Sequence, residues 1–110
     1  MRQLLIDELS REERANIESY LKRTLPPGSV EGIFWLAVPP DLLARPQQGH
    51  EECGPFCFAV ELGEDFLRLE LLIRSQTNLH CTCIAHATPA QREFVCNFAD
   101  ALLNEEMIRA

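Results

Sequence analysis

The feature that most constrains the fold is a pair of alternating segments joined by a short polar turn. In residues 56–62, and again in residues 66–74, apolar side chains occupy every second position. Gly63, Glu64 and Asp65 separate the two segments. Because successive side chains of a strand point to opposite faces of a sheet, this pattern predicts a β-hairpin with one buried face.

Two further segments have the character of strands. Residues 30–38 form an apolar run that is rich in β-branched and aromatic side chains, and Pro39 and Pro40 end it. Residues 79–87 follow a polar turn at 75–78 and again alternate in polarity. The sequence therefore predicts four strands, at residues 30–38, 56–62, 66–74 and 79–87.

Two capping boxes predict helices near the ends of the chain. Ser10 is followed three residues later by Glu13, and Thr88 is followed three residues later by Gln91. Apolar residues recur at helical spacing after both, and prolines at 26 and 27 end the first helix. The second helix extends for about five turns. Residues 3–9 fit either an additional helical turn or a short strand.

The order α-β-β-β-β-α favours one α+β domain over residues 1–110. The economical arrangement is a four-stranded antiparallel meander with the N- and C-terminal helices packed on one face. The face under the helices would then collect Phe56, Phe58, Val60, Leu62, Leu67, Leu69, Leu71, Ile73, Leu79, Cys81 and Cys83.

The charge distribution disfavours several classes of partner. The net charge is −7, and residues 26–65 alone contain seven acidic residues and one basic residue. Nucleic acids and anionic membranes require a concentrated basic surface, so we expect neither as a partner. No apolar stretch approaches a membrane span, and the N-terminus does not have the pattern of a signal peptide. We expect a cytoplasmic protein with reduced thiols, and the preference for Arg over Lys suggests a bacterial source.

No catalytic constellation is evident in the sequence. The chain has no Gly-x-Ser-x-Gly motif and no glycine-rich phosphate loop, and its paired carboxylates fall in turns or on solvated faces. A general acid or base needs a buried carboxyl group with a shifted pKa, and the pattern does not predict one. We therefore expect a non-enzymatic protein.

Histidines and cysteines form two clusters along the chain. One holds His50, Cys53 and Cys57, and the other lies within residues 80–86. In a strand, the two histidines of the second cluster would lie about 20 Å apart, and Cys81 and Cys83 would point into the core. The leading expectation is therefore no cofactor. The alternative is a small zinc site built from His50, Cys53 and Cys57, with Cys81 or Cys83 as a further ligand.

The second face of the predicted sheet mixes apolar and charged side chains. If the helices cover one face, Trp35 on the other needs a cover, which could be a dimer mate, a partner peptide, a small ligand or the 39–55 loop folded back. The candidate interface residues are Ile33, Trp35, Arg68, Glu70, Arg74, His80 and Ile84. We expect an adaptor that acts through protein contacts or homodimerisation. In size and charge, though not in any motif, the chain is similar to small acidic α+β dimers such as bacterial secretion chaperones.

Overall fold

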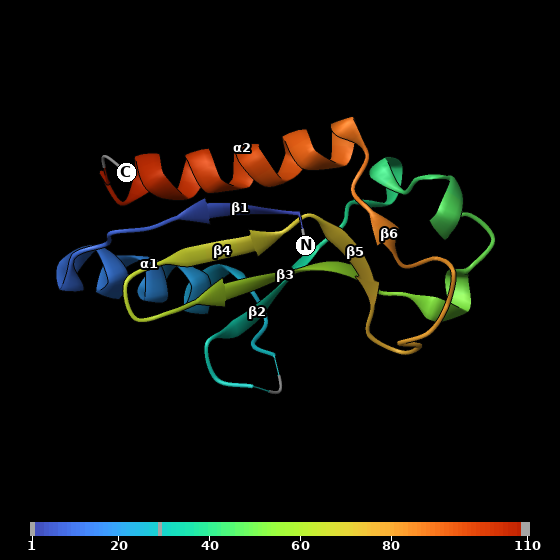
Figure 1. The fold of residues 1–110 in the computed structure, drawn as a ribbon, viewed down its shortest axis with the longest axis horizontal. Helices are drawn as coiled ribbons and strands as arrows, with labels where there is room; N and C mark the ends of the chain where they lie inside the picture. Colours follow the sequence, from blue (N-terminus) through green and yellow to red (C-terminus); the bar gives the residue numbers. More distant parts are fainter. Residues whose placement is uncertain (1, 29, 109–110) are drawn as a thin grey trace.

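A computed structural model describes residues 2–28 and 30–108, and the chain folds as an α+β domain (Figure 1). The sheet has six strands rather than the four predicted. The strands and helices are β1 (Gln3–Ile6), α1 (Arg11–Thr24), β2 (Ile33–Ala37), β3 (Phe56–Leu62), β4 (Leu67–Glu70), β5 (Leu72–Ser75), β6 (Ala85–His86) and α2 (Pro89–Glu105). Three short 3₁₀ helices lie between β2 and β3, at Pro40–Leu42, Arg45–Gln47 and Glu51–Cys53.

Both predicted helices begin at their capping boxes. The hydroxyl of Ser10 accepts a hydrogen bond from the backbone N–H of Glu13, and the Glu13 carboxylate accepts one from the N–H of Ser10. Thr88 and Gln91 make the same reciprocal pair at the start of α2. These bonds satisfy backbone donors that a helix leaves free at its first turn, so the local sequence is sufficient to set both starting points.

Strand β3 is the centre of the sheet. It pairs antiparallel with β2, and on its other side with β4 and β5 in turn. Strand β1 pairs antiparallel with β4. Of residues 3–9, for which the sequence allowed a helical turn or a strand, Gln3–Ile6 therefore form a strand. The predicted strand at 66–74 is divided at Leu71, whose N–H donates to the carbonyl of Arg2 and whose carbonyl accepts from the N–H of Ala87.

The predicted strand at residues 79–87 is wrong over most of its length. Only Ala85 and His86 pair with β5, and the residues before them turn back on themselves. The N–H of Ile84 donates to the carbonyl of Cys81, closing a tight turn. Leu79, which we expected in the core, is 72% exposed. The alternating polarity here belongs to a looped segment that buries Cys83 and half-buries Cys81 without the extended backbone of a strand.

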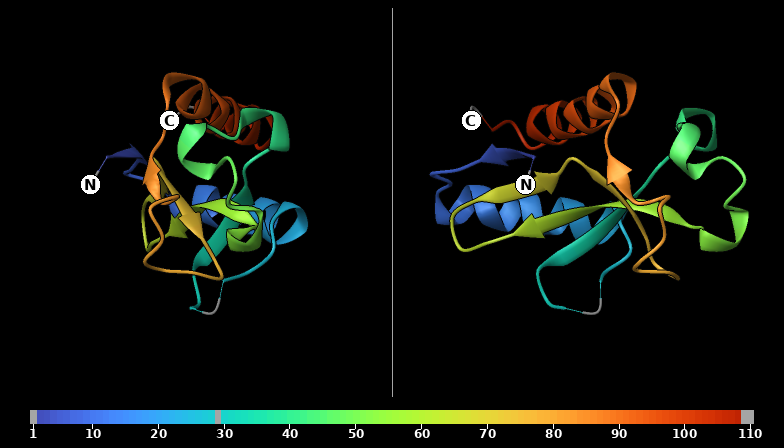
Figure 2. Two further views of the ribbon diagram at one scale, coloured as in Figure 1. Left: turned by 90° about the vertical axis from the view of Figure 1, so that its right-hand side faces the viewer. Right: turned by 45° about the vertical axis from the view of Figure 1, so that its right-hand side comes forward.

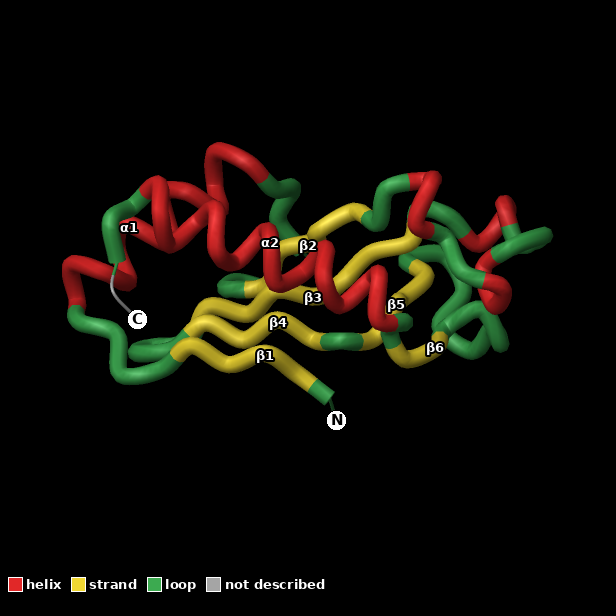
Figure 3. The backbone as a smooth tube through the Cα atoms, turned by 90° about the horizontal axis from the view of Figure 1, so that it is seen from above, coloured by secondary structure: helices red, strands yellow, loops and turns green. Residues whose placement is uncertain are grey.

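The two helices lie against one face of the sheet (Figure 2, Figure 3). The buried side chains between the helices and this face form the core. Phe94 of α2 stacks on Phe58 of β3 with ring centroids 6.2 Å apart, and Tyr20 of α1 meets Phe98 of α2 at 6.1 Å. The predicted placement of both helices is therefore correct. Among the described residues, no helix is long and apolar enough to span a membrane.

Candidate metal centre

The first half of the site is a single turn in the connection between β2 and β3. The N–H of Cys53 donates to the carbonyl of His50 at 2.9 Å, which is the i to i+3 bond of a 3₁₀ turn. Side chains three residues apart in such a turn lie on the same side. His50 and Cys53 therefore project together, from a position immediately before β3.

The second half is the turn that replaces the predicted fourth strand. Cys81 and Cys83 flank Thr82, and the hydrogen bond from Ile84 to Cys81 closes the turn around them. Cys83 is fully buried and Cys81 is half-buried. The expectation that both pack into the core therefore holds for Cys83, while Cys81 lies at its edge.

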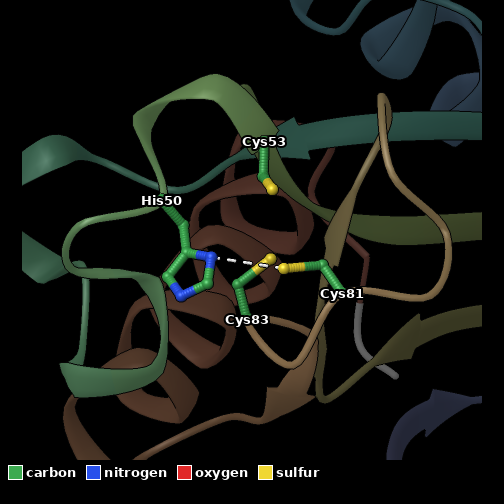
Figure 4. Close-up of side chains that lie close together, drawn as sticks. All are labelled: His50, Cys53, Cys81 and Cys83. Carbon is green, nitrogen blue, oxygen red and sulfur yellow. Dashed lines mark hydrogen bonds between the residues drawn. The ribbon is translucent and has the colours of Figure 1, made fainter.

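The two turns face one another and bring four ligating side chains together (Figure 4). The Sγ atoms of three cysteines and a ring nitrogen of His50 all lie within 4.8 Å of one another. Within this cluster of His50, Cys53, Cys81 and Cys83, the Cys81 Sγ lies 3.2 Å from His50 Nδ1. The cluster joins segments that are separated by 31 residues in the sequence.

Buried polar side chains anchor both turns. The buried polar or charged residues of the described chain are Gln47, Ser75 and Gln91, and all three lie next to the cluster or connect to it. Gln47 donates to the carbonyl of Cys83 at 2.7 Å, and the hydroxyl of Ser75 donates to the carbonyl of Cys53. Gln91 donates to the carbonyl of Leu42 and to the side-chain oxygen of Gln47. Such bonds fix the backbone that carries the thiols.

The three thiols have different electrostatic environments. Hydrogen bonds from the backbone and side chain of Cys83, with a further contribution from His50, lower the pKa of Cys81 to about 7. Burial, together with the neighbouring thiols, raises the pKa of Cys83 to about 12. Burial also raises the pKa of Cys53. The cluster therefore places one thiol that ionises near neutral pH beside two that keep their protons, and a metal ion binding there would displace those protons.

Three thiolates and one imidazole are a ligand set that suits Zn²⁺. Sulfur ligands about 2.3 Å from a tetrahedral zinc lie about 3.8 Å apart. The four ligand atoms lie within 4.8 Å of one another, which is about 1 Å wider than that spacing. Four protein ligands fill the tetrahedron, which is the arrangement of structural rather than catalytic zinc sites.

The sequence indicated His50, Cys53 and Cys57 as ligands, with Cys81 or Cys83 as a further one, and the structure brings together all of these except Cys57. Cys57 lies outside the cluster, because it is part of β3, where it pairs with Arg74 and its Sγ accepts a hydrogen bond from Gln76. Cys81 and Cys83 take its place. His80, His86 and Cys96 also lie outside the cluster. The available signal was the short Cys-x-Cys spacing, which the expectation of a strand led us to assign to the core.

The predicted interface residues lie mainly on the sheet face away from the helices. Arg68 pairs with Glu61 at 2.7 Å and Arg74 with Glu70 at 2.8 Å, while Ile33 is half-buried and His80 is exposed.

A cavity of about 550 Å³ opens beside Trp35, lined by Pro26, Pro27, Trp35, Arg74, Ser75, Gln76, Leu79 and Ile84. None of these lining residues belongs to the 39–55 loop, so among the described residues the loop does not line the cavity beside Trp35.

Comparison of the chain with protein-family models, with curated proteins and with solved structures finds no match in any of the three.

Proposed function

We propose that this protein is a small zinc-binding domain in which His50, Cys53, Cys81 and Cys83 hold one structural Zn²⁺. The observation that carries the proposal is the convergence of these four ligand atoms within 4.8 Å, from two turns that are distant in sequence. Exposed acidic clusters are common on surfaces without a metal, whereas three cysteines and a histidine around one point are the ligands of structural zinc sites.

The surroundings of the cluster support a structural role. Gln47 and Ser75 are 2% and 1% exposed, and each holds the backbone carbonyl of a ligating cysteine. A metal here would join the loop before β3 to the turn before β6, two segments that lack extensive sheet pairing of their own. Because binding energy at such a site is also folding energy, the ion would stabilise this end of the domain.

Elemental analysis of the untagged, reduced protein tests the proposal. We expect about one zinc per chain in the wild type, and a large loss of zinc in Cys53→Ser and Cys83→Ser. Cys96→Ser is the matched control, because Cys96 is exposed on α2 outside the cluster and its variant should retain the metal. A wild-type content below about 0.1 equivalent of zinc after expression in zinc-supplemented medium would rule out the proposal.

A second candidate function is that of a binding module that acts through the open sheet face. It is favoured by the cavity beside Trp35, whose rim carries the 72% exposed side chain of Leu79. Exposed apolar side chains beside a tryptophan are typical of interfaces. If the face forms a homodimer, sedimentation equilibrium will show association that Leu79→Asp weakens. A strict monomer at high concentration would exclude the homodimer.

A further inference from the structure

The proposed metal site and the Trp35 cavity are built from the same stretch of chain. Residues 75–84 contain Cys81 and Cys83 of the cluster, and they also contain four residues that line the cavity, namely Ser75, Gln76, Leu79 and Ile84. Ile84 directly follows a ligating cysteine. A displacement of the cysteine turn would therefore move a wall of the cavity.

Apart from the cluster, this stretch is held to the rest of the domain by the burial of Cys83 and by a few side-chain hydrogen bonds, among them that of Gln76 to the Sγ of Cys57 in β3. Residues 76–80 are all exposed, and several of their hydrogen bonds close on the stretch itself, such as that from Asn78 N–H to the hydroxyl of Ser75. The bonds from Thr77 to Glu52 and from Gln47 to Cys83 lead to the loop before β3, which carries the other two ligands. The two segments therefore depend on each other, and a metal ion held by the cluster would add a further attachment between them.

The opposite wall of the cavity belongs to the rigid part of the fold. Trp35 lies in β2, which is fully paired with β3, and the carbonyl of Pro26 accepts a hydrogen bond from the Trp35 N–H. The cavity thus has walls held by the sheet, which include Arg74 and Ser75 of β5, and one wall beside the cluster that is formed by Gln76, Leu79 and Ile84. Movement of the second wall relative to the first would change the cavity without unfolding the core.

We infer that metal occupancy controls the cavity beside Trp35: the bound ion holds residues 76–84 as its wall, and loss of the ion releases that wall. The inference rests on the proposed zinc site and adds a consequence for a second location. Because coupling between two sites is reciprocal, closing the cavity by a bound molecule would also tighten retention of the metal.

The single tryptophan makes the inference directly measurable. Trp35 emission and amide hydrogen exchange should be recorded for the zinc-loaded protein and after removal of zinc by a chelator under reducing conditions. We expect emission to shift to longer wavelength as Trp35 gains water contact. We also expect exchange in residues 76–84 to accelerate by about tenfold or more, while the amides of α2 keep their protection.

Variants on the other side of the site show whether the effect passes through the metal. The single variants His50→Ala and Cys53→Ser leave the sequence of residues 76–84 unaltered, and each removes one proposed ligand. Each variant should reproduce the emission shift without added chelator. Cys96→Ser should behave as the wild type does. Zinc content is measured on the same samples.

The outcomes separate this inference from the proposed function. If the wild type binds one zinc and its removal changes neither Trp35 emission nor exchange in residues 76–84, the zinc site stands and the coupling is wrong. If the wild type binds no zinc, both are wrong. If exchange accelerates equally in α2, the metal supports the whole fold rather than the cavity wall, which also overturns the inference.

Discussion

The side-chain amide of Gln47 donates a 2.7 Å hydrogen bond to the backbone carbonyl of Cys83, and the glutamine that makes this bond is 2% exposed. The bond crosses between the two segments that form the ligand cluster, and it does not depend on a metal. It therefore links the two turns whether or not an ion is bound. This preorganisation reduces the ordering that metal binding would require.

Replacing Gln47 should weaken both the fold and the metal site. Gln47→Ala leaves the buried carbonyl of Cys83 without its donor, so we expect a loss of about 1–3 kcal/mol in the free energy of unfolding. Loss of such an outer-shell partner should also lower zinc affinity by about 10–100-fold. Urea unfolding and competition with a chromophoric chelator measure the two effects. Gln48→Ala is the control, since Gln48 is exposed and adjacent, and equal effects from both variants would contradict the prediction.

The two capping boxes should differ in their contribution to stability. Glu13 and Gln91 occupy the same third helical position, and each accepts a hydrogen bond from its own N-cap N–H. Gln91 is also 1% exposed and donates to Leu42 at 2.8 Å, across to the loop before β3. We expect Glu13→Ala to cost about 0.5–1 kcal/mol and Gln91→Ala about 2–3 kcal/mol in unfolding free energy. A larger loss in Glu13→Ala would show that the loop contact is unimportant.

In the metal-free, reduced protein, Cys81 should be the most readily alkylated residue of the cluster. Its pKa of about 7 makes a large fraction of the side chain thiolate at neutral pH, and it is half-buried rather than enclosed. Cys83, with its pKa raised to about 12 and no exposed surface, should remain unmodified. Mass spectrometry after brief exposure to iodoacetamide measures both residues. Zinc should protect Cys81, and preferential labelling of Cys83 would contradict the prediction.

The stability of the metal-free protein should rise between pH 7 and pH 9. Cys81 has a folded-state pKa of about 7, below its ordinary value of 9.0, so the folded state binds fewer protons than the unfolded state in that interval. Its stabilising contribution is complete above pH 9 and is lost as the pH falls through 7. Cys83 has the opposite shift, to about 12, so its contribution is lost as the pH rises above 9.

Urea unfolding of the reduced, metal-free protein across this range measures the effect. Cys81→Ala should flatten the rise between pH 7 and pH 9 and leave the decline above pH 9 in place. Cys96→Ser provides the reference profile, because Cys96 lies on α2 outside the cluster. A rise that persists unchanged in Cys81→Ala would have to come from another group.

Elements with strong local signals were predictable from sequence. The reciprocal bonds of Ser10 with Glu13 and of Thr88 with Gln91 involve residues three positions apart, so the sequence alone locates both helix starts. Strand β3 was predicted with its observed boundaries, because its alternation is uninterrupted and a turn follows it. In contrast, β1 was ambiguous, since four residues carry too little periodicity to distinguish a strand from a helical turn.

The segment at 79–84 shows where local pattern fails. Its alternation resembles that of a strand because cysteine counts as apolar, yet these residues form turns whose inward side chains meet His50 and Cys53. A strand would have separated His80 from His86 and directed both cysteines at the helices, so the incorrect secondary structure also favoured Cys57 over Cys81 and Cys83 as a candidate ligand. Cys57 was the natural third ligand in sequence, but the ladder with Arg74 holds it in β3, outside the cluster.

The sequence by itself determined the α+β class, both helix starts and the central hairpin, because each depends on interactions among near neighbours. Its composition alone supplies enough thiol and imidazole side chains for a metal site. Only the tertiary structure decided which of those side chains share a site. That choice depends on the path of two irregular segments 31 residues apart, held by the buried amide of Gln47 and the hydroxyl of Ser75. Contacts between distant segments leave no periodic pattern in the sequence, and the two halves of the candidate metal centre are brought together by such contacts.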